Sequence, residues 1–224
     1  MVTTTAEGRT RASRLRPQQR RAHLLDVAAE LVLDTGFEAL TMEGLAQRAG
    51  VSKGLGYAYF QNAEELALAL YDREVGEVYR RIEEATTATA SFETRVRHAV
   101  NVYLDTVAQR GALLATLQTK LSGKRRDRTL RQRLAGFIGF WAQHIAAEFS
   151  VPPAVAEVLA GATLSAADAL ARAWLAKRVT RREAEELCVG FVLGGLAAAS
   201  TPARRRGSTP VAVESLPRPR KNER

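Results

Sequence analysis

The sequence predicts an all-α protein in which a three-helix helix-turn-helix domain precedes a larger helical bundle. Apolar residues recur at helical spacing through most of the 224 residues, and no alternating segment predicts a strand. Capping residues and glycines divide this pattern into helices. We therefore divide the chain into a basic disordered arm (1–16), the helix-turn-helix domain (17–62), the bundle (63–200) and a basic disordered tail (201–224).

Positive charge is concentrated in the two terminal segments. The chain carries a net charge of +9; residues 1–21 hold six arginines against Glu7, and residues 201–224 hold six arginines and one lysine against two glutamates. Each segment therefore carries +5, and the residues between them carry −1. Such segments either bind a polyanion or stay solvated and disordered, and both interpretations remain open for the tail.

The first two helices are marked by their ends. Pro17 suits a first helical turn, and we expect the first helix to run from there to about residue 34. Gly36 is expected to end it as a left-handed C-terminal cap, and the Thr41 hydroxyl to cap a short second helix. The apolar face of the first helix is expected to comprise Leu24, Val27, Ala28 and Leu31.

The later helices follow from similar signals. Asn62 is expected to cap a long helix, with Glu65 completing a capping box, and Thr180 and Glu183 form the same motif before the last helix. Gly111 is expected to end one helix and separate it from a shorter one. The expected helical segments are 92–111, 112–121, 130–145, 154–176 and 182–199. The last of these helices bears an apolar stripe of Ala184, Leu187, Phe191, Gly195 and Ala198.

The segment TMEGLAQRAGVSKGLGYAYF, residues 41–60, has the pattern of a helix-turn-helix. Gly50 permits a tight turn, and Ser52 can cap the second helix. No acidic residue occurs between Glu43 and Glu64, and a surface that faces DNA phosphates must be largely free of carboxylates. The residues expected on the outer side of the second helix are Lys53, Gly54, Tyr57 and Tyr59.

Residues 23–70 resemble the N-terminal domain of the tetracycline-repressor (TetR) family. The shared features are a Leu-Leu-Asp-x-Ala-Ala opening, Gly36-Phe37, Thr41, Leu45-Ala46, Ala49 to Gly54, Tyr57-x-Tyr59-Phe60 and Glu64-x-Leu66. The resemblance implies a DNA-binding head, a helical ligand-binding domain and dimerisation through the last two helices. The residues that it implies as DNA contacts are Thr41, Ser52, Lys53, Gly54, Tyr57 and Tyr59. To these we add Arg48, the other basic residue of the acid-free segment.

Two residues depart from the family pattern. Ala63 stands where many members have a lysine that contacts the phosphate backbone, and Gly56 stands where a bulky apolar residue is usual. Glycine costs about 1 kcal/mol relative to alanine in a helix, and Gly54 lies two residues away. Either this helix is ordered only on DNA, or Gly56 permits closer approach of its backbone to the duplex.

The bundle is expected to hold a ligand site. Facing helices commonly enclose such sites, although aromatic residues at helical spacing also form ordinary cores. The candidate pocket residues are Tyr103, Phe137, Trp141, His144 and Trp174, and Asn101 and Gln118 are further polar candidates. The three histidines (23, 98 and 144) lack metal-ligand spacing, and Cys188 is expected to pack in a core. We therefore predict no metal site and no cofactor.

Together these features predict a ligand-responsive transcriptional regulator. As a repressor, a homodimer would occupy a palindromic double-stranded DNA operator and leave it when a small apolar effector binds. Small residues in the last two helices favour close packing in a four-helix dimer interface, although a tight intramolecular bundle has the same composition. The alternatives are a non-specific architectural DNA-binding protein and a helical enzyme. No nucleophile–base pair or phosphate-binding loop supports the enzyme.

The expected location is the cytoplasm, without a membrane partner. The first residues lack the apolar segment of a signal peptide, and no apolar stretch is expected to reach the length of about 18 residues that a membrane span requires. The single cysteine excludes an internal disulfide.

Overall fold

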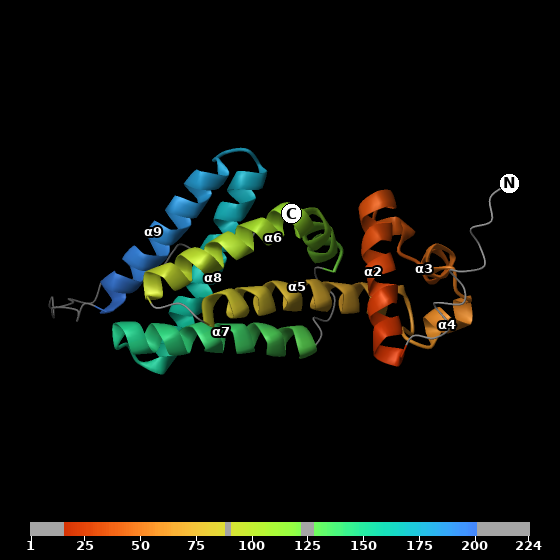
Figure 1. Cartoon of the computed structure of the whole chain (residues 1–224), viewed down its shortest axis with the longest axis horizontal. Helices are drawn as coiled ribbons and strands as arrows, with labels where there is room; N and C mark the ends of the chain where they lie inside the picture. The colour runs from red at the N-terminus through yellow and green to blue at the C-terminus, as the bar shows by residue number, and fades with distance from the viewer. Residues whose placement is uncertain (1–15, 88–90, 122–127, 201–224) are drawn as a thin grey trace, which may run out of the picture.

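The computed structural model describes residues 16–87, 91–121 and 128–200, which form eight α-helices, one 3-10 helix and no strand. The predicted all-α class is confirmed. In Figure 1, α2 to α4 form a small group at one end of the molecule, and α5 runs from this group into the bundle. The elements are α2 (Pro17–Thr35), η1 (Phe37–Ala39), α3 (Met42–Ala49), α4 (Lys53–Tyr57), α5 (Ala63–Thr87), α6 (Phe92–Lys120), α7 (Arg128–Phe149), α8 (Pro153–Leu175) and α9 (Arg181–Ser200).

The expected N-terminal caps are present. Each capping side chain accepts a hydrogen bond from the backbone N–H three residues later, which satisfies a donor that the helix leaves without a partner. The four caps are Thr41 (2.9 Å), Ser52 (3.2 Å), Asn62 (2.8 Å) and Thr180 (3.2 Å). At Thr180 the capping box is complete, because the Glu183 carboxylate accepts from the Thr180 N–H at 2.7 Å. Glu65 instead accepts from the N–H of Gln61, one residue before the cap.

Two glycines adopt backbone conformations that disfavour other residues. Gly50 ends α3 in the left-handed helical region (φ 65°, ψ 30°), as the predicted turn requires. Gly36 ends α2 with φ 90° and ψ 168°. The predicted left-handed cap at Gly36 is therefore wrong in its geometry, because the chain leaves the helix in an extended conformation. The positive φ still accounts for the glycine.

The predicted break at Gly111 is wrong, because α6 continues through it to Lys120. Gly111 is buried, and a Cβ atom there would lie 3.3 Å from Val107 Cγ1 and 3.5 Å from Leu175 Cδ1. The glycine therefore lets the end of α8 lie close against α6. It serves packing between helices and does not end one.

Two main apolar cores hold the helices together. The core of the first group draws on α2, α3 and Phe60, but also on the beginning of α5 and the end of α6 through Leu66, Leu70, Leu113 and Leu117. A second core lies among α6, α7, α8 and α9. Helix α6 contributes to both cores, and Val78 and Ile82 of α5 pack with Ala99 and Phe137 in a third cluster within the bundle. A displacement within the bundle can therefore reach the first three helices.

Arg73 on α5 links this helix to α2 by charge. Arg73 Nη1 donates to Asp26 Oδ1 on α2 at 2.6 Å, and Arg73 Nη2 donates to Glu74 Oε1 at 2.5 Å. The Glu74 side chain is only 8% exposed, and its second oxygen lies 3.9 Å from Arg110 Nε on α6. A buried carboxylate needs such partners, and these two arginines supply them.

The apolar stripe expected on α9 lies on the surface of the single chain apart from Ala184. Leu187 is 51% exposed and Phe191 is 62% exposed, and Gly195 and Ala198 also lie on the surface. The side that packs into the second core consists of Ala184, Cys188, Val189, Val192 and Leu196. Both sides of α9 are apolar, so helical spacing alone could not decide which one faces the bundle.

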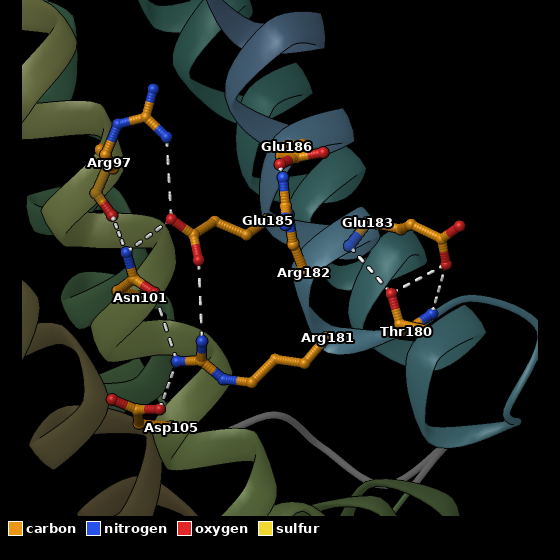
Figure 2. A network of polar contacts seen from close by, with 9 residues as sticks. All are labelled: Arg97, Asn101, Asp105, Thr180, Arg181, Arg182, Glu183, Glu185 and Glu186. Carbon is orange, nitrogen blue, oxygen red and sulfur yellow. Dashed lines mark hydrogen bonds and ion pairs between the residues drawn. The ribbon is translucent and has the colours of Figure 1, made fainter.

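A polar network fixes the rotation of α9 against α6 (Figure 2). Arg181, in the first turn of α9, donates to Asp105 Oδ1 at 2.5 Å and to Asn101 Oδ1 at 3.2 Å. Asn101 Nδ2 in turn donates to Glu185 Oε1 at 2.9 Å, and Arg97 Nη1 lies 3.7 Å from the same oxygen. These contacts hold Glu185 toward α6 and leave Leu187 and Phe191 facing outward.

Helix α8 is more apolar than expected. By length and composition, Pro153–Leu175 is apolar enough to cross a membrane, with a mean hydropathy of 1.4, so the expectation that no segment reaches this length is wrong. Here α8 lies in the bundle between α7 and α9, with Ala156, Ala160 and Ala171 in the second core. Val158 on its outer side is 71% exposed.

Candidate nucleic-acid interface and bundle cavities

The short helix α4 is held on α3 by its inner side. Gly56 is buried, and a Cβ atom there would lie 3.3 Å from Met42 Cε on α3. Phe60, just after α4, is 1% exposed. The departure at Gly56 therefore reflects close approach between two helices of the same domain. Gly56 thus lies on the side of α4 that packs on α3.

The outer side of α4 carries the residues expected to face DNA. Lys53 and Tyr57 are exposed, and the Lys53 ammonium lies 5.8 Å from the centre of the Tyr57 ring. Ser52 and Gly54 are also exposed, and a Cβ atom added at Gly54 would meet nothing within 4 Å. Thr41 is exposed at the start of α3, where its hydroxyl also serves as the helix cap. The structure thus brings these five residues to the surface near the turn.

A carboxylate from α3 joins this surface. Glu43 forms an ion pair with Lys53, which lowers the pKa of the Glu43 carboxyl and raises the pKa of the Lys53 ammonium. The absence of acidic residues from 44–63 therefore does not make the folded surface free of them. Phosphates that approach Lys53 must displace or tolerate Glu43.

The other two candidate DNA contacts, Arg48 and Tyr59, are directed toward neighbouring parts of the same domain. Arg48 forms an ion pair with Asp34, and its Nη2 lies 3.8 Å from Glu30 Oε2, so its guanidinium is directed toward α2. Tyr59 is half-buried and packs against the first core. Both positions are compatible with a role in orienting α4.

The larger cavity in the bundle, of about 370 Å³, lies among α5, α6, α7 and α8. Most of its wall is apolar. The polar side chains on it are Gln118, Arg131, Ser165, Asp168 and Arg172. Asp168 pairs with Arg172 and accepts a hydrogen bond from the Tyr103 hydroxyl at 3.2 Å, whereas Arg131 forms no ion pair within the described part of the chain. Such a cavity suits a ligand with an apolar body and a polar or anionic end.

A smaller cavity of about 70 Å³ lies among α6, α7, α8 and α9. Its wall includes Phe92, Trp141 and Cys188 and is almost entirely apolar. Burial raises the pKa of the Cys188 thiol to about 11, so the thiol remains protonated. Within the described residues, no group of three His, Cys, Asp or Glu side chains could hold a metal ion.

The predicted pocket residues are only partly brought together. Tyr103, Phe137 and Trp141 line the small cavity, and Tyr103 also lines the large one. His144 lines neither; its Nδ1 lies 2.5 Å from Arg95 Nη1, and burial and this arginine lower its pKa. Trp174 lies at a separate surface pocket beside the α8–α9 turn.

Sequence reasoning missed the contribution of α5 to the large cavity. Tyr71, Val75, Val78 and Tyr79 line it, but none of the predicted pocket residues lies on α5. The available signal was a pair of tyrosines on a helix whose apolar stripe is otherwise aliphatic. Arg131 and Arg172 were also missed, because arginines on a helix are usually solvated.

Comparison with known proteins relates this arrangement to a family. Residues 24–70 match the family described as bacterial regulatory proteins, tetR family. The chain is 37% identical over 100 residues to the HTH-type transcriptional activator FasR of Mycolicibacterium smegmatis, covering 45% of this chain and 46% of FasR. It is 28% identical over 105 residues to the HTH-type transcriptional repressor NemR of Escherichia coli, covering 46% of this chain and 53% of NemR. The chain thus spans about half the length of these relatives.

A solved structure extends the likeness to most of the chain. The transcriptional regulator FadR from Bacillus subtilis, solved in complex with stearoyl-CoA, superposes with a TM-score of 0.58. It is 18% identical, and the match covers 78% of this chain and 98% of that chain. At this identity the likeness shows a shared fold.

Proposed function

Because the chain belongs to the TetR family of bacterial regulatory proteins, whose members regulate transcription and are not enzymes, we propose that it is a ligand-responsive DNA-binding regulator. It acts in the cytoplasm as a homodimer on a near-palindromic operator, which an amphipathic effector releases. As a repressor it blocks transcription by occupying the operator. The division into a head at 17–62 and an effector and dimerisation domain at 63–200 is part of this proposal.

The observation that carries the proposal is the exposed side of α4. A recognition helix must leave its outer side chains free while its inner side is anchored, and α4 meets both conditions through Gly56 and Phe60. Lys53 and Tyr57 are then available for phosphate contacts that orient the helix in the major groove.

Dimerisation is supported by the outer sides of α8 and α9. Contiguous apolar surface on soluble proteins commonly marks an interface, and Leu187, Phe191, Val155 and Val158 are all exposed in the single chain. The exposed glycines 194 and 195 would allow two copies of α9 to approach closely. A two-fold dimer places its recognition helices about 34–36 Å apart, one turn of the duplex.

The effector class is supported by the larger cavity. Its mostly apolar wall and its two arginines suit a molecule with an aliphatic chain and an anionic end. The Bacillus subtilis FadR of the same fold was solved with stearoyl-CoA, which has this chemistry. We therefore propose a long-chain acyl thioester or a similar amphipathic anion as the effector.

Selection of bound sequences from a random duplex pool tests the function directly. We expect a near-palindromic site to be enriched and bound at least about a thousand-fold more tightly than random duplex at fixed salt. Equal affinity for selected and random duplexes would contradict this and favour the architectural alternative. Release of the selected duplex by acyl-CoA thioesters tests the effector separately.

Lys53→Ala and Tyr57→Phe are each expected to weaken operator binding without lowering the melting temperature. Each removes a phosphate contact worth about 1 kcal/mol or more per chain, so affinity should fall at least about five-fold. Both side chains are exposed, so the fold loses little. Fluorescence anisotropy with labelled operator measures the affinity. If a variant binds the operator as tightly as wild type does, the substituted residue does not contact DNA.

The two glycines of α4 offer a matched pair of substitutions. Gly54→Ala and Gly56→Ala each add helix propensity worth up to about 1 kcal/mol. Only Gly54 faces open space, so its methyl group is expected to obstruct the duplex and to lower operator affinity about ten-fold. Gly56→Ala meets only the flexible end of Met42 and should leave affinity nearly unchanged. Equal effects of the two variants on affinity would contradict the orientation of α4.

A further inference from the structure

The two bundle cavities share part of their walls. Tyr103 and Leu164 line both cavities. Beside them, Phe137 on the small cavity stacks on Tyr79 on the large cavity, with ring centres 4.1 Å apart and planes 11° apart. The two cavities are therefore neighbours, with these side chains between them.

Tyr103 is the member of this wall that is held by a specific polar contact. Its hydroxyl donates to Asp168 Oδ1 at 3.2 Å, and Asp168 is paired with Arg172. Asp168 and Arg172 both lie on the wall of the large cavity. Burial raises the pKa of the Tyr103 hydroxyl to about 12, so it remains a donor at neutral pH. The ring is thus fixed from the side on which an effector would enter.

We propose that Tyr103 sets the length of the aliphatic chain that the effector site accepts, by closing the small apolar cavity against the large one. The proposal rests on the effector site proposed above. A ligand that ends at Tyr103 uses only the large cavity, whereas a longer one must displace the ring and break its hydrogen bond to Asp168. Since a molecule of liquid water occupies about 30 Å³, the additional space holds roughly two groups of methylene size.

The test uses the full-length protein and three variants. Tyr103→Ala opens the wall, and Tyr103→Phe removes only the bond to Asp168. Leu114→Ala is the control, because Leu114 lines the large cavity alone and its truncation enlarges the site without opening the wall. Binding of saturated acyl-CoA thioesters from octanoyl-CoA to stearoyl-CoA is measured by calorimetry, after circular dichroism has established that each variant is folded.

Tyr103→Ala is expected to move the preferred chain about two carbons upward. Each methylene that becomes buried raises affinity about four-fold, which corresponds to about 0.8 kcal/mol, so the ratio of long-chain to short-chain affinity should rise about 15-fold. Tyr103→Phe should move the preference in the same direction by less, and Leu114→Ala should leave it in place. An unchanged preference in Tyr103→Ala, or an equal change in Leu114→Ala, would overturn the proposal.

Xenon binding in pressurised crystals tests the role of Tyr103 independently of the proposed effector class. Apolar cavities of this size take up xenon, which needs no effector. In wild type we expect two separate xenon sites on either side of Tyr103, and in Tyr103→Ala one continuous region. If no acyl-CoA binds wild type, the proposed effector class is wrong. The xenon result still tests whether Tyr103 separates the two cavities. Two separate sites in Tyr103→Ala would overturn the role of Tyr103.

Discussion

Phe191→Arg is expected to yield a monomer and to lower operator affinity about a thousand-fold or more, toward the level of non-specific binding. In an isologous interface each substitution occurs twice, so the new arginines lie near one another at the two-fold axis and repel. Phe191 is largely exposed in the single chain, so the substitution leaves the second core intact. A monomer holds only one recognition helix and loses the contribution of the second half-site. Sedimentation velocity measures the assembly, and anisotropy at fixed salt measures the affinity.

Two further variants make this result specific. Gly195→Arg adds the same charge at a position where a Cβ atom meets nothing within 4 Å, and it should also give monomers. Ala147→Arg places an arginine on an exposed position of α7 and should leave both assembly and affinity unchanged. A Phe191→Arg protein that sediments as wild type would contradict the assignment of α9 to the interface.

Deleting residues 1–15 is expected to make operator binding much less sensitive to salt. Residues 22–74 contain three basic residues against nine acidic ones, a net charge of −6, and Ala63 replaces the lysine usual in the family. Arg48 and Lys53 are moreover paired with carboxylates. The helix-turn-helix domain therefore attracts DNA weakly. We propose that the basic arm supplies the attraction, by following the DNA backbone or by entering the minor groove. Residues 1–15 of this arm lie outside the residues that the structure describes.

The expected size follows from counterion release. The deletion removes Arg9, Arg11 and Arg14 and keeps Arg16, whose N–H donates to Gln19 Oε1 at the start of α2. Each neutralised phosphate contributes about −0.9 to the slope of log affinity against log salt, so a dimer that loses six arginines should show a slope shallower by up to about 5. Removing residues 201–224 is the control, because it deletes a basic segment that is far from the helix-turn-helix domain in the sequence. An unchanged slope in the arm deletion would mean that the arm only aids solubility.

Features that depend on neighbouring residues could be predicted from the sequence. The caps at Thr41, Ser52, Asn62 and Thr180 form where expected, because each needs only a side-chain oxygen and an N–H three residues later. The turn at Gly50 is equally local. These signals were sufficient to predict α3 and α4 and to predict that Lys53 and Tyr57 lie on the surface.

Features set by distant contacts could not be predicted. The sequence around Gly111 predicts a helix end, because no residue near it in the sequence indicates that Leu175 packs beside this glycine in the folded bundle. The orientation of α9 depends on Arg181 and its partners on α6, far away in the sequence. The candidate pocket was incomplete for the same reason, since α5 and α7 meet α6 and α8 only in three dimensions.

The shared guanidinium of Arg73 limits how freely this protein can be recombined with its relatives. Because Arg73 pairs with Asp26 on α2 and with the buried Glu74 on α5, a foreign head grafted at the start of α5 would remove Asp26 and leave the Arg73 guanidinium without its partner on α2. Chimeric sensors made by exchanging DNA-binding heads should therefore keep Asp26 and Arg73 as a pair, or place the junction beyond Glu74. The chain is in this respect less modular than its two-part sequence pattern suggests.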